Sequence, residues 1–189
     1  APVLVPDIAN RDAAIRALRL KGEGPVAILC PGAEYGPAKR WPPTHFADLA
    51  RRLLESGARV WILGSPNDRL AADAVIGAAG ESAKRIRDLT GKTDLGTAID
   101  LLSAASVVIS NDSGLMHAAA AVGAPVVALF GSSSPAYTPP LSPQARIARI
   151  DIACSPCFKR ECPLGHFKCM RELAPELVYN LARSTMPVH

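Results

Sequence analysis

The chain has 189 residues, of which 49% are hydrophobic and 20% charged, and this is enough apolar material for one well-buried domain with a small appendage. Its formal charge of +4 favours an anionic partner, but Lys and Arg are scattered along the chain, which argues against a nucleic-acid-binding arm. No apolar run approaches the roughly 18 to 20 residues of a membrane span, and a basic-then-apolar signal pattern is lacking, so we expect a cytoplasmic protein.

The first segment, residues 1–24, begins without Met and with the loose stretch APVLVPDIAN, which is typical of a processed protein or an excised domain. We expect it to form a linker and a helix that leads in from a preceding domain.

Short β-branched runs then alternate with segments of helical periodicity. Apolar residues at i, i+3 and i+4 spacing predict a helix that begins after Thr44 and ends at Gly57, and a second around Leu95 to Leu102. This alternation predicts a Rossmann-like parallel sheet over residues 25–153, with helices on both faces. The expected strands are VAIL (26–29), RVWIL (59–63), RIRDL (85–89), VVIS (107–110), VVALF (126–130) and ARIARI (145–150).

The residues that directly follow four of these strands are small or polar. In a parallel sheet, ligands bind beyond the carboxyl ends of the strands. Small residues let backbone N–H groups approach a ligand, and a helix N-terminus adds partial positive charge, so this rim is predicted to hold a phosphate or diphosphate. The residues are Pro31-Gly32, Gly64-Ser65, Asn111 to Gly114, and Gly131 to Ser134.

The polar segment 111–114 is the most informative part of this rim. Asp112 or Ser113 can cap a helix that begins at residue 114, which leaves the N–H groups of residues 114–116 directed into the crevice. His117 shares a helix face with Ser113 and is expected to face the same ligand. The alternative is that Asp112 and Ser113 only cap the helix and His117 is a core histidine. Without a G-x-G-x-x-G fingerprint, the residues alone indicate a nucleotide or phosphate crevice and no more.

Three stretches of the chain resemble one known family. NDSGLMHAAAAVGAPVVALFG closely resembles the donor-site signature of glycosyltransferase family 9, the lipopolysaccharide heptosyltransferases. PGAEYGPAKRWPPTHFADLARRLLESGARVWILGSPND looks like the first strand-loop-helix of that family's nucleotide-binding domain. CSPCFKRECPLGHFKCM is similar to the tail of many heptosyltransferase II sequences. Together these stretches cover nearly the whole chain, in order.

The resemblance implies a GT-B enzyme with two Rossmann-like domains, of which this chain matches the C-terminal half. That half would bind ADP-L-glycero-β-D-manno-heptose as donor substrate, with no cofactor required. The lipopolysaccharide inner-core acceptor and the catalytic base, an aspartate, would belong to the N-terminal domain. The chain alone would then be inactive, and the whole enzyme would be an inverting glycosyltransferase at the inner face of the bacterial inner membrane.

The resemblance also implies roles for individual residues. Lys39 would pair with the donor diphosphate and follow the charge that develops on the leaving group; the alternative is a solvated surface lysine. The N–H groups of Ser113, Gly114 and Leu115 would hold phosphate oxygens. Asp112 is assigned to sugar hydroxyls, with helix capping as its alternative.

The donor-binding set is completed by His117, Gly32 and Thr90. Adenine and ribose are expected near the loops after the second and third strands, at Ser65 to Asp68 and Leu89 to Lys92. Glu34-Tyr35 stands where some relatives carry hydroxyl residues before the lysine, which puts a hydroxyl contact to phosphate in doubt there.

The last segment, residues 154–189, is expected to form a cysteine-containing loop and a C-terminal helix at 174–183, packed on the same domain. Its cysteines have the spacing C-x2-C-x4-C-x6-C. A structural zinc site is one interpretation, free thiols are another, and redox use is a third. The four are Cys154, Cys157, Cys162 and Cys169, while Cys30 stands alone at the end of a strand.

Three classes of function therefore remain open: the donor half of a heptosyltransferase, the donor half of another GT-B sugar-nucleotide enzyme, and a non-enzymatic metal or redox module. Scattered charge and the absence of basic clusters exclude nucleic acid as the expected partner.

Overall fold

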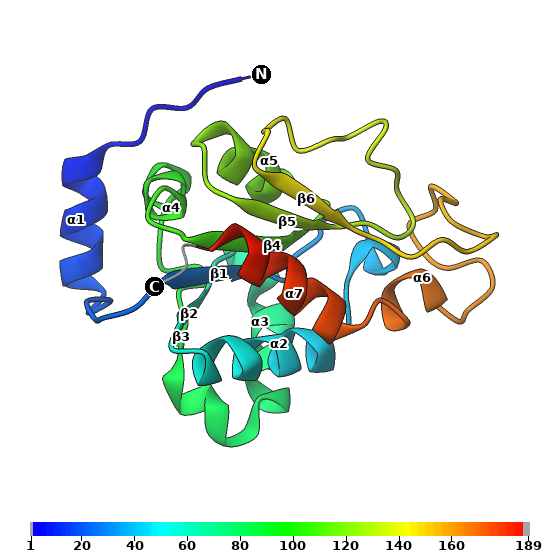
Figure 1. Cartoon of the computed structure of the whole chain (residues 1–189), viewed down its shortest axis with the longest axis horizontal. Coiled ribbons are helices and arrows are strands. Elements are labelled where there is room, and N and C mark those ends of the chain that lie inside the picture. The colour runs from blue at the N-terminus through cyan, green and yellow to red at the C-terminus, as the bar shows by residue number, and fades with distance from the viewer. Residues whose placement is uncertain (1, 187–189) are drawn as a thin grey trace.

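Six parallel strands form one sheet in the computed structural model, which describes residues 2–186 (Figure 1). The strand order is β3-β2-β1-β4-β5-β6. This confirms the Rossmann-like fold class, and each strand agrees with its expected range within two residues at either end. The strands are β1 (Val26–Cys30), β2 (Arg59–Ile62), β3 (Ile86–Asp88), β4 (Val107–Asn111), β5 (Val126–Leu129) and β6 (Ala145–Ala148).

Helices connect the first five strands as the sequence pattern predicts, whereas residues 130–144 join β5 to β6 without a helix. The first helix after β1 begins at Pro43, two residues earlier than expected, because proline is well tolerated in the first turn of a helix. The helices are α1 (Ile8–Ala17), α2 (Pro43–Glu55), α3 (Arg69–Ala78), α4 (Leu95–Leu102), α5 (Gly114–Ala121), α6 (Lys168–Arg171) and α7 (Pro175–Thr185). Short 3-10 turns are η1 (Pro37–Lys39), η2 (Pro66–Asp68) and η3 (Gly80–Arg85).

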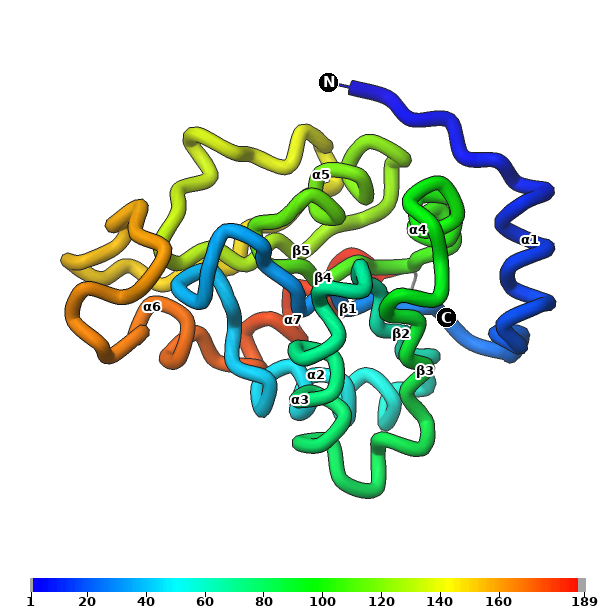
Figure 2. The backbone as a smooth tube through the Cα atoms, turned by 180° about the vertical axis from the view of Figure 1, so that it is seen from behind, coloured from blue at the N-terminus to red at the C-terminus, as the bar shows by residue number. Residues whose placement is uncertain are grey.

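Helices cover both faces of the sheet (Figures 1 and 2), and the core forms one layer on each face. Successive side chains of a strand point to opposite faces, so Ala27 and Leu29 of β1 join the layer under α2, α3 and α7. Ile28 and Cys30 join the layer under α4 and α5. The chain therefore crosses from one face to the other between the first and second halves of the sheet.

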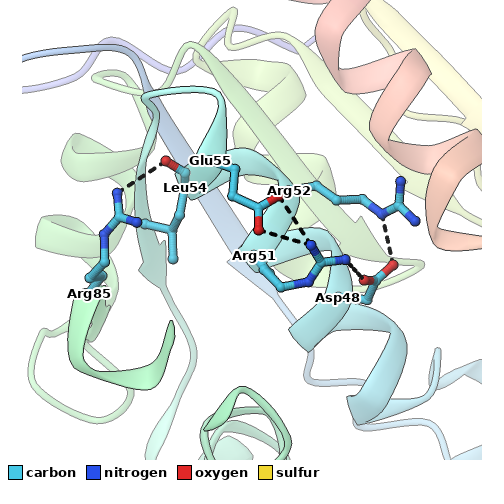
Figure 3. A network of polar contacts seen from close by, with 6 residues as sticks. All are labelled: Asp48, Arg51, Arg52, Leu54, Glu55 and Arg85. Carbon is cyan, nitrogen blue, oxygen red and sulfur yellow. Dashed lines mark hydrogen bonds and ion pairs between the residues drawn. The ribbon is translucent and has the colours of Figure 1, made fainter. Parts of the chain in front are cut away.

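The outer face of α2 carries a chain of ion pairs (Figure 3). Arg51 lies 2.5 Å from Asp48 and 2.9 Å from Glu55, and Arg52 lies 2.8 Å from Asp48. Burial acts to raise the pKa of Asp48, but hydrogen bonds from the two arginines leave that pKa below its ordinary value. Exposed pairs contribute little to stability, so the apolar face of α2 holds this helix in place.

The leading segment packs on the domain through both apolar and polar contacts: Leu20 is buried in the core, and Ile15 and Leu18 pack against it. Asp100 of α4 accepts hydrogen bonds at 2.7 Å from the backbone N–H of Asp7 and at 2.7 Å from the Asn10 side chain. Helix α1 has no buried residues. Among the described residues, no helix combines the length and apolar character needed to cross a membrane. Residues 1 and 187–189, the ends of the two predicted terminal segments, lie outside the described part.

Candidate functional site

The strand order places the topological switch point of the sheet between β1 and β4. The helix that follows β1 covers one face of the sheet and the helix that follows β4 covers the other, so the two connecting loops diverge at the carboxyl ends of adjacent strands. Open α/β sheets bind ligands at such a switch point. Here the loops are residues 31–42, which contain Lys39, and residues 112–113.

Asn111, the last residue of β4, joins these two loops. Its side chain is fully buried, accepts a hydrogen bond from the backbone N–H of Trp41 at 3.0 Å and donates one to the carbonyl of Pro31 at 2.8 Å. The Trp41 ring is itself buried and donates to the carbonyl of Leu173 at 2.9 Å. Asn111 therefore fixes both ends of the loop that carries Lys39. The sequence pattern places Asn111 in the polar rim but does not predict that it braces this loop, although an amide residue that ends an apolar strand is the available signal.

Lys39 and Asp112 face each other across the switch point. Lys39 Nζ lies 2.5 Å from Asp112 Oδ2, and the two side chains are only 16% and 4% exposed. Asp112 Oδ2 also accepts a hydrogen bond from Thr138 Oγ1 at 3.3 Å. The alternative of a solvated surface lysine is thus wrong. The site instead holds a largely buried cation whose partner is the carboxylate expected to contact the sugar.

The predicted helix cap is also wrong. Ser113 occupies the N-cap position of α5, but neither its side chain nor that of Asp112 caps the helix. Ser113 Oγ lies 3.1 Å from Ser110 Oγ, and Asp112 is held by Lys39. The first N–H groups of a helix have no partner within it, so those of α5 are left without a side-chain cap.

The other residues expected at this helix end differ in how open they are. Gly114 is exposed, and a Cβ added to it would meet nothing within 4 Å. Leu115 is half-buried, and His117 is exposed on the outside of α5. His117 is therefore no core histidine, and its ring is accessible to a ligand.

Gly32 makes room for the carboxylate of Asp68. A Cβ at residue 32 would lie 2.1 Å from Asp68 Oδ1, so only glycine allows Asp68 to sit against this loop. Asp68 Oδ2 accepts hydrogen bonds from the backbone N–H and the hydroxyl of Ser65, each at 2.8 Å. This brings the loops after β1 and β2 together at the same end of the sheet.

Thr90 lies deeper than expected. It is fully buried, and its backbone N–H donates to Asp88 Oδ1 at 2.9 Å. Its carbonyl accepts a hydrogen bond from Arg69, while its hydroxyl has no partner among the described residues. The Thr90 side chain therefore does not line an open crevice in this structure.

The four late cysteines converge on one small cavity. We call residues 154–169 the cysteine loop. Its four thiols line a cavity of about 20 Å³ together with Ala38 and Ser132. The hydroxyl of Ser132 is buried and has no partner among the described residues. A space of about 10 to 15 Å³ is enough for one water, so this cavity has room for one water molecule or one ion.

The thiols of this loop differ in acidity. The backbone N–H of Phe167 donates to Cys162 Sγ at 3.4 Å, and such hydrogen bonds lower the pKa of Cys162. Burial raises the pKa of Cys169, and the three other thiols of the loop raise it further. Burial also raises the pKa of Cys30, which lies apart in the core. Within residues 2–186, no group of three or more His, Cys, Asp or Glu side chains is arranged to hold a metal ion.

Comparison with known proteins relates this architecture to one family. The sequence profile of glycosyltransferase family 9 (heptosyltransferase) matches residues 5–168. Lipopolysaccharide heptosyltransferase 2 of Escherichia coli K12 is 41% identical over 160 residues, which are 84% of this chain and 46% of that protein. Lipooligosaccharide heptosyltransferase 2 of Haemophilus influenzae is 48% identical over 132 residues, which are 69% of this chain and 38% of that protein.

A solved structure shows the same fold. The structure of E. coli ADP-heptose lps heptosyltransferase II matches with a TM-score of 0.86 at 37% identity, over 97% of this chain and 53% of that one. The chain thus spans about half the length of the relatives it matches.

Proposed function

Because this chain belongs to glycosyltransferase family 9, we propose that it is the donor-binding half of a lipopolysaccharide heptosyltransferase and binds ADP-L-glycero-β-D-manno-heptose. The relatives named above are heptosyltransferases, and one is named for ADP-heptose. The observation that carries the proposal is the meeting of Lys39, Asp112 and the uncapped start of α5 at the switch point of the sheet.

The two ends of the donor would contact different groups. The N–H groups of Ser113, Gly114 and Leu115 would bind phosphate oxygens at the positive end of α5, with Lys39 beside them. Asp112 repels a phosphate, so it would accept hydrogen bonds from hydroxyls of the sugar. The exposed ring of His117 lies on the same helix and is available to the same ligand.

Adenine and ribose would lie toward the loops after β2 and β3, on the Asp68 side of Gly32. Asp68 Oδ2 is used by Ser65, whereas Oδ1 forms no hydrogen bond with a described residue and is available to a ribose hydroxyl. This agrees with the expectation that ribose lies near residues 65–68. Thr90 would contribute only through its backbone, since its side chain is enclosed.

The chemistry of this half would be stabilisation of the leaving group. In an inverting transfer, a base removes the proton of the acceptor hydroxyl, and the acceptor oxygen bonds to the anomeric carbon as the bond from that carbon to the diphosphate breaks. Negative charge then grows on the departing ADP, where Lys39 and the amides of α5 would meet it. To do so, Lys39 has to exchange Asp112 for phosphate oxygens. The catalytic base and the lipopolysaccharide acceptor site are proposed to lie in a second domain, at the cytoplasmic face of the inner membrane.

A structural metal ion in the cysteine loop remains part of the proposal. The four cysteines around a cavity with room for one ion favour a metal site. The four sulfur atoms are not arranged as a metal site, so they would have to move closer together to reach the roughly 2.3 Å of a zinc–sulfur bond. Metal analysis of protein purified under reducing conditions tests this, and a metal-free chain of unchanged stability would leave free thiols.

Calorimetry of the chain with ADP, ADP-heptose and a UDP-sugar tests the main proposal. We expect ADP and ADP-heptose to bind and the UDP-sugar to bind much more weakly. Preference for the UDP-sugar would indicate another GT-B enzyme. Binding of none of the three, together with stoichiometric metal, would indicate a metal module instead.

A further inference from the structure

The cysteine loop packs directly on the turn that carries Lys39. Figures 1 and 2 both place the segment after β1 beside this loop. The backbone N–H of Ala38 donates to the carbonyl of Arg160 at 3.0 Å. A Cβ at Gly36 would lie 2.6 Å from the same carbonyl oxygen, so only glycine permits this approach. The backbone of Arg160 is therefore held against the residue that precedes Lys39.

The side chain of Arg160 reaches the same aromatic ring as Lys39. Lys39 Nζ lies 4.9 Å from the centre of the Tyr35 ring, and the Arg160 guanidinium lies 5.6 Å from it. The Tyr35 hydroxyl donates to the carbonyl of Phe158 in the cysteine loop at 3.1 Å, which fixes the ring. Two cations are thus gathered on one ring whose π-electrons attract both.

The two cations differ in their counter-charges. Lys39 is neutralised by Asp112, whereas Arg160 forms no ion pair with any residue between 2 and 186. Glu34 and Glu161 are close to Tyr35 and Arg160 in the sequence, but neither forms an ion pair with the guanidinium. Arg160 is exposed, so its charge is accessible to a ligand.

From these contacts we infer that Arg160 is a second phosphate-binding residue of the donor site, which binds the diphosphate together with Lys39. This inference rests on the proposed function. An incoming diphosphate has to displace Asp112 before it reaches Lys39, but it meets no competing carboxylate at Arg160. The guanidinium can also bind two phosphate oxygens at once, which an ammonium does less well. The cysteine loop would then be part of the donor site through Arg160.

Lys159 provides a matched control for this inference. It is adjacent to Arg160 and exposed, and its removal changes the net charge of the chain equally. It contacts neither Tyr35 nor an acidic residue among the hydrogen bonds and ion pairs of the described chain. A general loss of positive charge would affect both variants equally, whereas a specific phosphate contact would affect only Arg160→Ala.

The experiment is calorimetric titration of wild type, Arg160→Ala, Arg160→Lys and Lys159→Ala with ADP and with adenosine. We expect Arg160→Ala to lower ADP affinity about 10- to 100-fold, as loss of a hydrogen bond to a charged group does. Adenosine, which has no phosphate, should bind all four proteins equally, and Arg160→Lys should restore part of the ADP affinity. Melting temperatures check that each variant is folded.

The outcomes separate this inference from the proposal beneath it. If the wild-type chain binds adenosine and ADP equally, or binds neither, the proposed diphosphate site is wrong and the role of Arg160 is wrong with it. If ADP binds the wild type tightly but Arg160→Ala matches Lys159→Ala, only the Arg160 inference is overturned. A parallel loss of adenosine affinity in Arg160→Ala would also overturn it, because that loss indicates a structural role.

Discussion

Gly114→Val is the sharpest test of the phosphate site at the start of α5. Gly114 is exposed, a Cβ there meets nothing within 4 Å, and its φ lies outside the left-handed region. The new side chain therefore causes neither backbone strain nor overpacking. Differences in helix propensity are at most about 1 kcal/mol, so we expect the free energy of unfolding to change by no more than that.

The same substitution should strongly reduce ADP binding. Its side chain would occupy the space in front of the first N–H groups of α5, where the phosphate is proposed to lie. Loss of one hydrogen bond to a charged group costs about 1.5 to 3 kcal/mol, which corresponds to about a 10- to 100-fold weaker affinity. Gly77→Val is the matched control, because Gly77 lies in α3, is exposed and also has nothing within 4 Å of an added Cβ.

Urea unfolding followed by circular dichroism, together with ADP titration of both variants, measures the two quantities. The expected pattern is normal stability for both proteins and weakened binding for Gly114→Val alone. Normal ADP affinity in folded Gly114→Val would refute the assignment of a phosphate to this helix end.

Three further predictions concern the surroundings of this helix end. Lys39→Ala should weaken ADP binding by about 1.5 to 3 kcal/mol and also lower the melting temperature, because it strands the carboxylate of Asp112. Adding Asp112→Asn to Lys39→Ala should recover the melting temperature but not the ADP affinity. Unchanged ADP affinity in Lys39→Ala would show that Lys39 does not contact the diphosphate. Asn111→Ala should cost about 2 to 5 kcal/mol of unfolding free energy in urea melts, since it leaves a buried N–H and a buried carbonyl unpaired; a loss below 1 kcal/mol, of the order expected for a surface residue, contradicts its role. If the cysteine loop binds a metal ion, a chelator should lower the melting temperature and also weaken ADP binding, because Ala38 contacts this loop. An unchanged melting temperature after the chelator has removed the ion contradicts a structural role for the ion.

Local patterns were sufficient to predict the layered architecture. Strands buried on both faces read as short β-branched runs, and α2 shows its apolar face at helical spacing, so element type and order follow from neighbours in the chain. Parallel pairing then places every strand's carboxyl end at one edge, and this predicted that the segments after β1 and β4 share one rim. Lys39 was assigned to that rim through the family resemblance, and the structure pairs it with Asp112, 73 positions further along the chain.

The contacts between loops were decided only by the tertiary structure. No local pattern indicates that Asp112 pairs with Lys39 instead of capping α5, because a carboxylate beside a helix start suits both roles. The same holds for Gly32, which makes room for Asp68, and for the approach of Arg160 to Tyr35. Such contacts depend on how the loops fold over the edge of the sheet, and loop paths are set by packing between distant segments, not by the periodicity of any one of them.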